Sequence, residues 1–395
     1  MNRFLWTQQS NFGPSDRGVG AMAYDSVRGR VVLFGGRSST GQIFGDTWEW
    51  DGSFWTQVED IGPSPRFASA MVYDTARRVC LLFGGRDKDN QFLADTWQWD
   101  GSKWTKLSES GPSSRSNHAM AYDNNRGRTV LFGGYPPDTP LGDTWEFDGD
   151  TWTQQQDAGP LARSRHGMAF DDAGARTILF GGLALDGSSP EDTWSWDGND
   201  WVQIAEFGPS PRFEAALAST QDGSLILYGG VDNVVQGKPA ILADTWEFDG
   251  KRWTQRQDIG PGPLREATIA FDSLRGRVVL FGGQTPAPDG TTWELPAAPI
   301  HIASLQIDSH IPSGNNRPLT VVLSRPTSAT GAVITFSGPI FTPQGADLGP
   351  ITLEPGIKSK VIPVGFAHAV TPTTVTFSVA IEGTPPVSAT VIVDP

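Results

Sequence analysis

Residues able to transfer protons occur at matching points of a repeated sequence phrase that begins with Gly-Pro. His118 and His166 occupy the same position in two adjacent copies. Glu214 and Glu266 stand one position earlier in the two copies that follow. An imidazole can act as a general base and a carboxyl as a general acid when the fold brings both to one substrate. These four residues are therefore candidate catalytic residues, and a mechanism that uses only the two carboxyls stays open.

Positions that differ between copies are the better candidates for ligand contacts, because the packing of a repeat does not dictate them. They supply guanidinium groups that could hold an anion, together with aromatic rings and one amide. The candidate ligand-binding residues are Arg37, Phe67, Arg86, Asn117, Tyr135, Arg165, Phe213 and Arg265. Polar groups that converge around a concavity are the usual hypothesis for a ligand site.

A second set of arginines repeats without variation, four residues after each Gly: Arg17, Arg66, Arg115, Arg163 and Arg212. Each of these copies also has an Asp before its Thr-Trp pair: Asp46, Asp95, Asp143, Asp192 and Asp244. The last copy has Leu264 and Thr291 instead, so both partners are lost together. Joint loss favours an Arg–Asp ion pair inside each repeat, although a ring of arginines that contacts a ligand stays open.

The repeated phrase has a period near fifty residues. Its Gly-Gly pairs begin at 35, 84, 133, 181, 229 and 282. Within the first copy, short apolar runs over 21–24 and 30–34 predict two strands, and Trp-containing runs over 47–50 and 55–57 predict two more. Asp51-Gly52 is typical of a tight hairpin between the last two. Four antiparallel strands cannot bury both faces alone, so neighbouring copies must cover them.

This pattern of Phe-Gly-Gly, a loop, a Trp strand and a second Trp resembles the kelch repeat over residues 1–298. The resemblance implies an all-β, six-bladed β-propeller, because kelch repeats are blades of that fold. All 15 tryptophans fall on the predicted third and fourth strands, so we expect them to be structural. Kelch repeats often carry a His after the Arg, which favours a structural role for His118 and His166.

The ends of the repeat region predict how the ring closes. Trp6-Thr7-Gln8 matches a fourth strand with no first three before it, and the last copy lacks a fourth strand after Trp293. We expect the N-terminal strand to complete the last blade, which leaves no unpaired edge. The loops between strands two and three and between blades share one end of the propeller, where a site is expected. The repetitive turns at the other end carry arginines such as Arg28 and Arg275, expected to be solvated charges.

Residues 299–395 follow a Pro-Ala-Ala-Pro linker and contain neither Trp nor Tyr. Alternating runs such as 319–323, 333–336 and 374–379 predict a β-sandwich of about seven strands. The segment is similar to immunoglobulin-like modules of bacterial surface and secreted proteins. A kelch propeller with such a module also resembles galactose oxidase in layout, but the only cysteine, Cys80, lies on a predicted core strand, which argues against the Tyr–Cys copper centre of that family.

The formal net charge of −14 argues against nucleic acid and anionic membranes as partners. We expect no metal and no cofactor. The sequence predicts a bacterial, secreted or surface propeller that binds a ligand, a glycan or a peptide, at the loop end of its channel; a cytoplasmic location stays open. Two alternatives remain: an isomerase, lyase or hydrolase acting on a sugar or secondary metabolite at the same mouth, and a protein-interaction scaffold.

Overall fold

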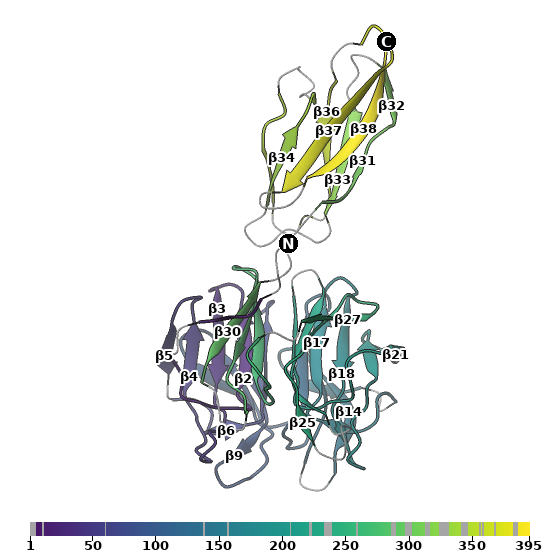
Figure 1. Ribbon diagram of the computed structural model, residues 1–395. Helices are drawn as coiled ribbons and strands as arrows, with labels where there is room; N and C mark the ends of the chain where they lie inside the picture. Colours follow the sequence, from purple (N-terminus) through teal and green to yellow (C-terminus); the bar gives the residue numbers. More distant parts are fainter. Residues whose placement is uncertain are drawn as a thin grey trace. The chain divides into compact units, whose positions relative to one another are not determined.

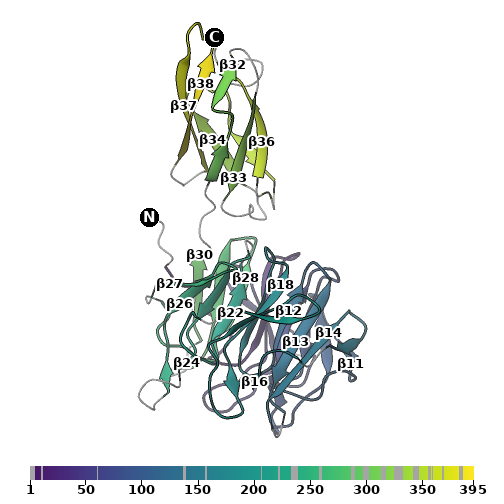
Figure 2. The same cartoon turned by 90° about the vertical axis from the view of Figure 1, so that its right-hand side faces the viewer.

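The structure is a computed structural model and contains only strands, turns and loops in the residues that it describes. Those residues are 5–9, 12–59, 61–136, 139–155, 158–205, 207–220, 223–232, 239–257, 260–285, 290–296, 302–312, 317–323, 332–340, 347–354, 357, 359–366, 369–381 and 386–395. The chain forms two compact units, one of Arg3–Ala297 and one that includes Ala298–Pro395. We describe each unit by itself (Figures 1 and 2).

The first unit is a propeller of six four-stranded antiparallel sheets, as the six Gly-Gly pairs predict. The first three blades are β2 (Ala21–Asp25), β3 (Arg30–Phe34), β4 (Thr47–Trp50) and β5 (Trp55–Glu59); β7 (Ala70–Asp74), β8 (Val79–Phe83), β10 (Thr96–Trp99) and β11 (Trp104–Ser108); and β12 (Ala119–Asp123), β13 (Arg128–Gly134), β14 (Leu141–Phe147) and β15 (Trp152–Gln154).

The remaining blades are β17 (Gly167–Asp171), β18 (Arg176–Phe180), β20 (Thr193–Trp196) and β21 (Trp201–Ala205); β22 (Ala216–Ser219), β23 (Leu225–Tyr228), β26 (Thr245–Phe248) and β27 (Trp253–Gln257); and β28 (Thr268–Asp272), β29 (Arg277–Phe281), β30 (Thr292–Pro296) and β1 (Thr7–Gln8). Apolar side chains of adjacent sheets form one cluster in each space between blades. Burial between blades explains why the second strands are apolar on both faces.

The N-terminal strand closes the ring, which confirms the prediction from the sequence. β1 pairs antiparallel with β30, placing Thr7 opposite Glu294 and Gln8 opposite Trp293. Trp6 donates from Nε1 to Thr245 Oγ1 of the fifth blade at 3.0 Å. The same Trp–Thr hydrogen bond crosses each of the other five spaces between blades, at 2.8–3.0 Å. The fourth-strand tryptophans are therefore structural.

The Gly-Gly pair ends each second strand because the backbone turns there into the left-handed region. Gly35 and Gly36 have φ of 66° and 105°. A Cβ atom on Gly35 would lie 2.5 Å from the carbonyl oxygen of Arg66, so the next blade approaches too closely for any side chain.

The repeated arginines at the hairpin end of the propeller are not simply solvated, so that expectation was wrong. Arg28 pairs with Asp25 in its own turn and with Glu49 on the third strand, both at 2.6 Å. Arg275 pairs with Asp272 at 2.5 Å. These ion pairs hold the first hairpin, because the carboxylate also accepts hydrogen bonds from the turn backbone.

The second unit packs a three-stranded sheet and a five-stranded sheet around one apolar core. Its strands are β31 (Ile302–Gln306), β33 (Arg317–Leu323) and β36 (Ser359–Val364) in one sheet, and β32 (His310–Pro312), β38 (Val387–Asp394), β37 (Thr373–Ile381), β34 (Ala332–Ser337) and β35 (Ile351–Leu353) in the other. The three alternating runs named above lie in β33, β34 and β37. The immunoglobulin-like identity of this unit stays a prediction.

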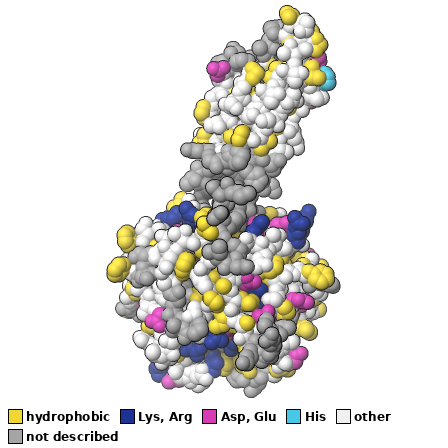
Figure 3. Space-filling model, in the orientation of Figure 1, with side chains coloured by type: hydrophobic (Ala, Val, Ile, Leu, Met, Phe, Trp, Pro, Cys, Tyr) yellow, Lys and Arg dark blue, Asp and Glu magenta, His cyan; other side chains and the backbone are white. Residues whose placement is uncertain are grey.

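The surface shown in Figure 3 mixes basic, acidic and apolar side chains, and neither sign of charge dominates among the residues described there. No helix in the described part of the chain is long and apolar enough to cross a membrane.

Candidate functional site

The candidate site is built on a closed ring of backbone hydrogen bonds at the loop end of the propeller. In each blade the residue two positions after the arginine slot has a left-handed backbone, with φ between 51° and 59°. Its N–H donates to the carbonyl of the equivalent residue in the preceding blade at 2.8–3.1 Å. We call these six residues the axial ring: Val19, Ala68, Asn117, Arg165, Glu214 and Glu266.

A left-handed conformation is uncommon for residues other than glycine and costs free energy at each position. The ring of hydrogen bonds offsets that cost, since it satisfies one donor and one acceptor per blade. The backbone at this end is therefore fixed by all six blades together, while the side chains are free to differ.

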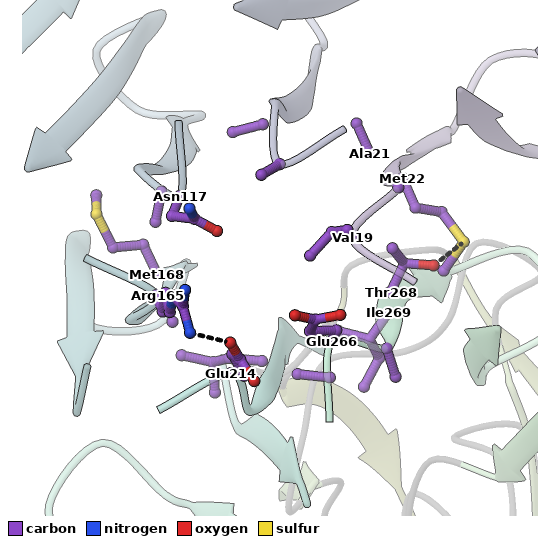
Figure 4. A pocket seen from close by; sticks show the side chains of 18 of the residues that line it. Val19, Ala21, Met22, Asn117, Arg165, Met168, Glu214, Glu266, Thr268 and Ile269 are labelled. Atoms are coloured by element: carbon purple, nitrogen blue, oxygen red, sulfur yellow. Dashed lines mark hydrogen bonds and ion pairs between the residues drawn. The ribbon is translucent and has the colours of Figure 1, made fainter. Parts of the chain in front are cut away.

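A cavity of about 210 Å³ lies at the axial ring and is lined by it and by the first residues of the innermost strands. We call it the axial cavity. Its rim is apolar at Val19 and Ala68 and polar from Asn117 through Arg165 to the two glutamates. Figure 4 shows Val19 and these polar residues around the cavity. One side of the mouth can thus form hydrogen bonds and the other can form van der Waals contacts.

The two glutamates form a carboxyl pair in which Glu214 is buried and Glu266 is half-buried. Glu214 is only 9% exposed, and Arg165 donates from Nη1 to its Oε1 at 2.5 Å (Figure 4). Arg265 Nη1 lies 3.7 Å from Glu214 Oε2, too far for a hydrogen bond. The buried Oε2 atoms of Glu214 and Glu266 have no hydrogen-bond partner among the described residues.

Burial and then the charge of Glu266 raise the pKa of Glu214 to about 7, and the charges of Arg165 and Arg265 oppose this rise. Two carboxyls that share one site resist double ionisation, so the pair holds a proton near neutral pH. Such a pair can donate and accept hydrogen bonds or exchange a proton with a ligand.

His118 and His166 each follow an axial-ring residue directly in the sequence, and both line the axial cavity. His118 and His166 are 6% and 7% exposed, and their rings meet Phe83 and Phe132 edge-on at 5.4 and 5.5 Å. No ring nitrogen of either residue has a hydrogen-bond partner in the described structure.

Burial lowers the pKa of both imidazoles, and a repeat arginine beside each lowers it further. The pKa of His118 falls well below its ordinary value, and that of His166 falls to about 3. Both rings are therefore neutral at pH 7 and are weak bases. The carboxyls are better placed than the imidazoles to transfer a proton here.

The residue after each Gly-Gly pair forms a short bridge with the residue that precedes the axial ring. Phe67 of β6 (Arg66–Phe67) pairs with Arg86 of β9 (Arg86–Asp87), and Ser164 of β16 (Arg163–Ser164) pairs with Leu183 of β19 (Leu183–Ala184). The equivalent bridges in the other blades are Gly18–Arg37, Ser116–Tyr135, Phe213–Val231 and Arg265–Gln284. Val231 belongs to β24 (Val231–Asp232), which pairs with β25 (Ala240–Ile241). In Figure 1, β6, β9 and β25 gather at one end of the blades.

Four of the predicted ligand contacts pack against one another in two pairs, and a fifth, Arg265, bonds to a residue outside the predicted set. The Arg37 guanidinium lies 4.5 Å from the centre of the Phe67 ring, and Arg165 lies 5.8 Å from that of Phe213. Arg265 donates from Nη2 to Gln284 Oε1 at 3.2 Å. The aromatic rings therefore hold guanidinium groups at the mouth.

A second cavity, of about 390 Å³, lies beside the axial cavity. We call it the side cavity. It collects Arg86, Asn117, Tyr135 and Arg165 from the predicted ligand-binding set. Asn117 and Arg165 also line the axial cavity, so the two cavities share them. The other four predicted ligand-binding residues line neither cavity: Arg37, Phe67, Phe213 and Arg265.

The invariant arginines form ion pairs inside each blade, as their joint loss with Asp predicts. Arg66 is 1% exposed and donates two hydrogen bonds to Asp95, at 2.6 and 3.0 Å, and a third to the Gly84 carbonyl at 3.1 Å. The other four pairs repeat this geometry at 2.6–2.7 Å. With their donors occupied, these arginines are structural rather than ligand contacts.

Val19, Ala68 and Ser164 lie at the same variable positions of the repeat as the predicted site residues, and the structure adds them to the two cavities. Sequence reasoning missed Leu183 and Leu185 of the side cavity. Leu185 lies in a loop of variable length, where alignment gives no signal. The described residues contain no group of three His, Cys, Asp or Glu side chains able to hold a metal ion.

Comparison with known proteins agrees with this architecture. A search of curated proteins found no match. The solved structure titled "Structure of YjhT" superimposes with a TM-score of 0.58 at 16% sequence identity, over 72% of this chain and 97% of that chain. At that identity the likeness concerns the fold alone.

The family model described as the KLHDC2/KLHL20/DRC7 Kelch-repeats domain matches residues 53–157 and 100–283, which together span more than half of the chain. The matched region contains the Gly-Gly pairs that begin at 84, 133, 181, 229 and 282. Six blades, an Arg–Asp pair in five of them and this match lead to one conclusion: the chain belongs to the kelch-repeat family described by that model.

Proposed function

We propose that the propeller binds a small hydroxyl-rich ligand, one sugar unit of a glycan, in the axial cavity. The kelch fold supports a ligand-binding or interaction role in general. The observation that carries the finer proposal is the carboxyl pair, whose buried Oε2 atoms have no hydrogen-bond partner outside the pair in the described structure. Buried polar atoms of this kind require a partner, and a bound ligand would supply one.

The chemistry of the mouth suits neighbouring hydroxyl groups. Carboxylate oxygens accept hydrogen bonds from hydroxyls, while Arg165 and Asn117 donate to them. Val19 and Ala68 supply the apolar surface that the C–H face of a sugar needs. A cavity of about 210 Å³ is smaller than the sites of about 300–1,000 Å³ that hold drug-sized ligands, so it fits a single unit.

Isothermal titration calorimetry with neutral monosaccharides, disaccharides and short peptides tests this proposal. Glu266→Gln should weaken the binding of a saccharide about tenfold or more, because a charge-assisted hydrogen bond is lost. Glu191→Gln, at an exposed loop carboxylate, is the matched control and should bind as the wild type does. Binding of peptides but not saccharides, or equal affinity of Glu266→Gln and wild type, would contradict a glycan site at the carboxyl pair.

One observation favours catalysis at the same mouth as a second candidate. A carboxyl whose pKa is about 7 can both donate and accept a proton at neutral pH. Glu214 would then transfer the proton in an isomerisation, elimination or hydrolysis, with Arg165 holding its orientation. Nuclear magnetic resonance of a bound saccharide would reveal turnover, and Glu214→Gln should abolish turnover while binding is retained.

A further inference from the structure

The side cavity carries features that the proposed function does not use. Its polar wall consists of Arg86, Tyr135, Ser164 and Arg165, and Leu183 and Leu185 form part of its apolar wall. Arg86 does not line the axial cavity, and neither Glu214 nor Glu266 lines the side cavity. The two cavities therefore differ in charge, although they are adjacent.

Positive charge is in excess at the side cavity. Arg86 Nε is buried and has no hydrogen-bond partner, and no described carboxylate forms an ion pair with this guanidinium. The guanidinium is instead held over the Phe92 ring at 4.5 Å. Arg165 is the second cation, and its charge is only partly offset because Glu214 also faces Arg265.

The electrostatics agree with this geometry. Burial and then the charges of Arg37 and Arg165 lower the pKa of Arg86, while Tyr135 opposes the shift. A guanidinium without a carboxylate partner, beside other cations, is stabilised most by an incoming anion. Carboxylates and phosphates match the fork of guanidinium donors and can accept a further hydrogen bond from a phenol or hydroxyl.

Part of the lining of the side cavity is apolar. Leu185 is 68% exposed although it lines the cavity, and Leu183 is half-buried on β19. An exposed leucine beside an unpaired guanidinium would become buried if a ligand carried an apolar group next to its anion.

We propose that the side cavity binds an oxoanion, a carboxylate or a phosphate monoester, that is attached to a compact apolar group. Arg86 and Arg165 would bind the anion, with Tyr135 and Ser164 as hydrogen-bond donors. Leu183 and Leu185 would cover the apolar group. This site shares Arg165 with the axial cavity but uses Arg86 and not the carboxyl pair, so the Arg86 variant tests it apart from the glycan proposal.

Titration calorimetry of the full chain with benzoate, phenyl phosphate, acetate and inorganic phosphate tests the inference. Benzoate or phenyl phosphate should bind at least about tenfold more tightly than acetate or inorganic phosphate, because only the former bury apolar surface. Preference between benzoate and phenyl phosphate then separates the two sources of anion. Arg86→Gln should weaken the preferred ligand about tenfold or more.

Two matched controls complete the experiment. Arg37→Gln removes a charge near Arg86 but no group that lines the side cavity, and it should weaken binding less than Arg86→Gln does. Leu185→Ser should weaken binding, whereas Leu161→Ser, with a similar exposure of 69%, should not. Absence of binding to the wild type, equal affinity for inorganic phosphate and phenyl phosphate, or equal losses in Arg37→Gln and Arg86→Gln would each overturn the proposal.

Discussion

Arginine and carboxylate side chains meet in two regions of the propeller, with opposite outcomes. In the blade walls, five Arg–Asp pairs are nearly identical, and each guanidinium is 0–3% exposed with its hydrogen bonds satisfied. At the axial ring, Arg165 and Arg265 face Glu214 from different blades, and buried carboxylate oxygens remain unpartnered in the described structure. The Arg–Asp pairs that repeat between blades have their hydrogen bonds satisfied, whereas the charged residues that differ between blades do not.

The sixth blade explains why this difference is informative. Leu264 takes the arginine position there and is buried, and Thr291 accepts the indole hydrogen bond of Trp293 at 2.8 Å. The wall can thus be built from an ion pair or from an apolar residue and a hydroxyl, provided that both partners change together. At the axial ring, the glutamates have no compensating partner of this kind, although a purely structural carboxylate would need one.

The largest expected effect comes from removing β1, the strand that completes the sixth blade. Deletion of residues 1–10 removes β1 and the Trp6–Thr245 hydrogen bond, and exposes the edge of β30. We expect aggregated or insoluble protein rather than a folded monomer. Size-exclusion chromatography and thermal unfolding check this, and a monomer with an unchanged melting temperature would refute closure by this strand.

Next in size is the loss of one wall pair. Asp95→Ala leaves the Arg66 charge buried without its partner, which should lower the free energy of unfolding by about 3–5 kcal/mol. Urea denaturation measures it. As the matched change at the axial ring, Glu266→Gln should leave stability equal or higher, because it removes a like charge. A similar loss of unfolding free energy in Asp95→Ala and Glu266→Gln would contradict the difference between the Arg–Asp pairs and the axial ring.

A smaller loss should follow when one hydrogen bond between blades is removed. Thr96→Val deletes the acceptor of Trp152 Nε1, which is 3.0 Å from Thr96 Oγ1, and leaves a buried donor unsatisfied. We expect a loss of about 1–3 kcal/mol in the free energy of unfolding. Thr105→Val, at an exposed position of β11, is the control and should unfold with the wild type.

The last expected effect is a pH dependence confined to the axial ring, which is small over any one pH unit. The pKa of Glu214 rises from 4.5 to about 7 on folding. The folded protein therefore binds more protons than the unfolded chain between these values, so this contribution to stability falls as pH rises, by at most about 1.4 kcal/mol per pH unit. Subtracting the stability of Glu214→Gln from that of the wild type at each pH isolates it; a flat difference would contradict the raised pKa.

Much of the fold could be predicted from the sequence. The six Gly-Gly pairs gave the number of blades, and the unmatched Trp6 strand predicted how the ring closes. The joint absence of Arg and Asp from the last copy predicted the wall pairs. The solvated role expected for Arg28 and Arg275 was wrong, because a repeated turn does not reveal that its arginine reaches Asp25, Glu49 or Asp272.

Internal repetition alone determined the blades and their order, since each copy carries the same local periodicity and the same partners. Only the tertiary structure decided which of the variable residues meet. Closing six blades brings Glu214 and Glu266, 52 positions apart, onto neighbouring points of one hydrogen-bonded ring, while it places Arg86 beside Arg165 in a different cavity. Local sequence encodes strands, but the distance between side chains on separate strands is fixed only when the circle is complete.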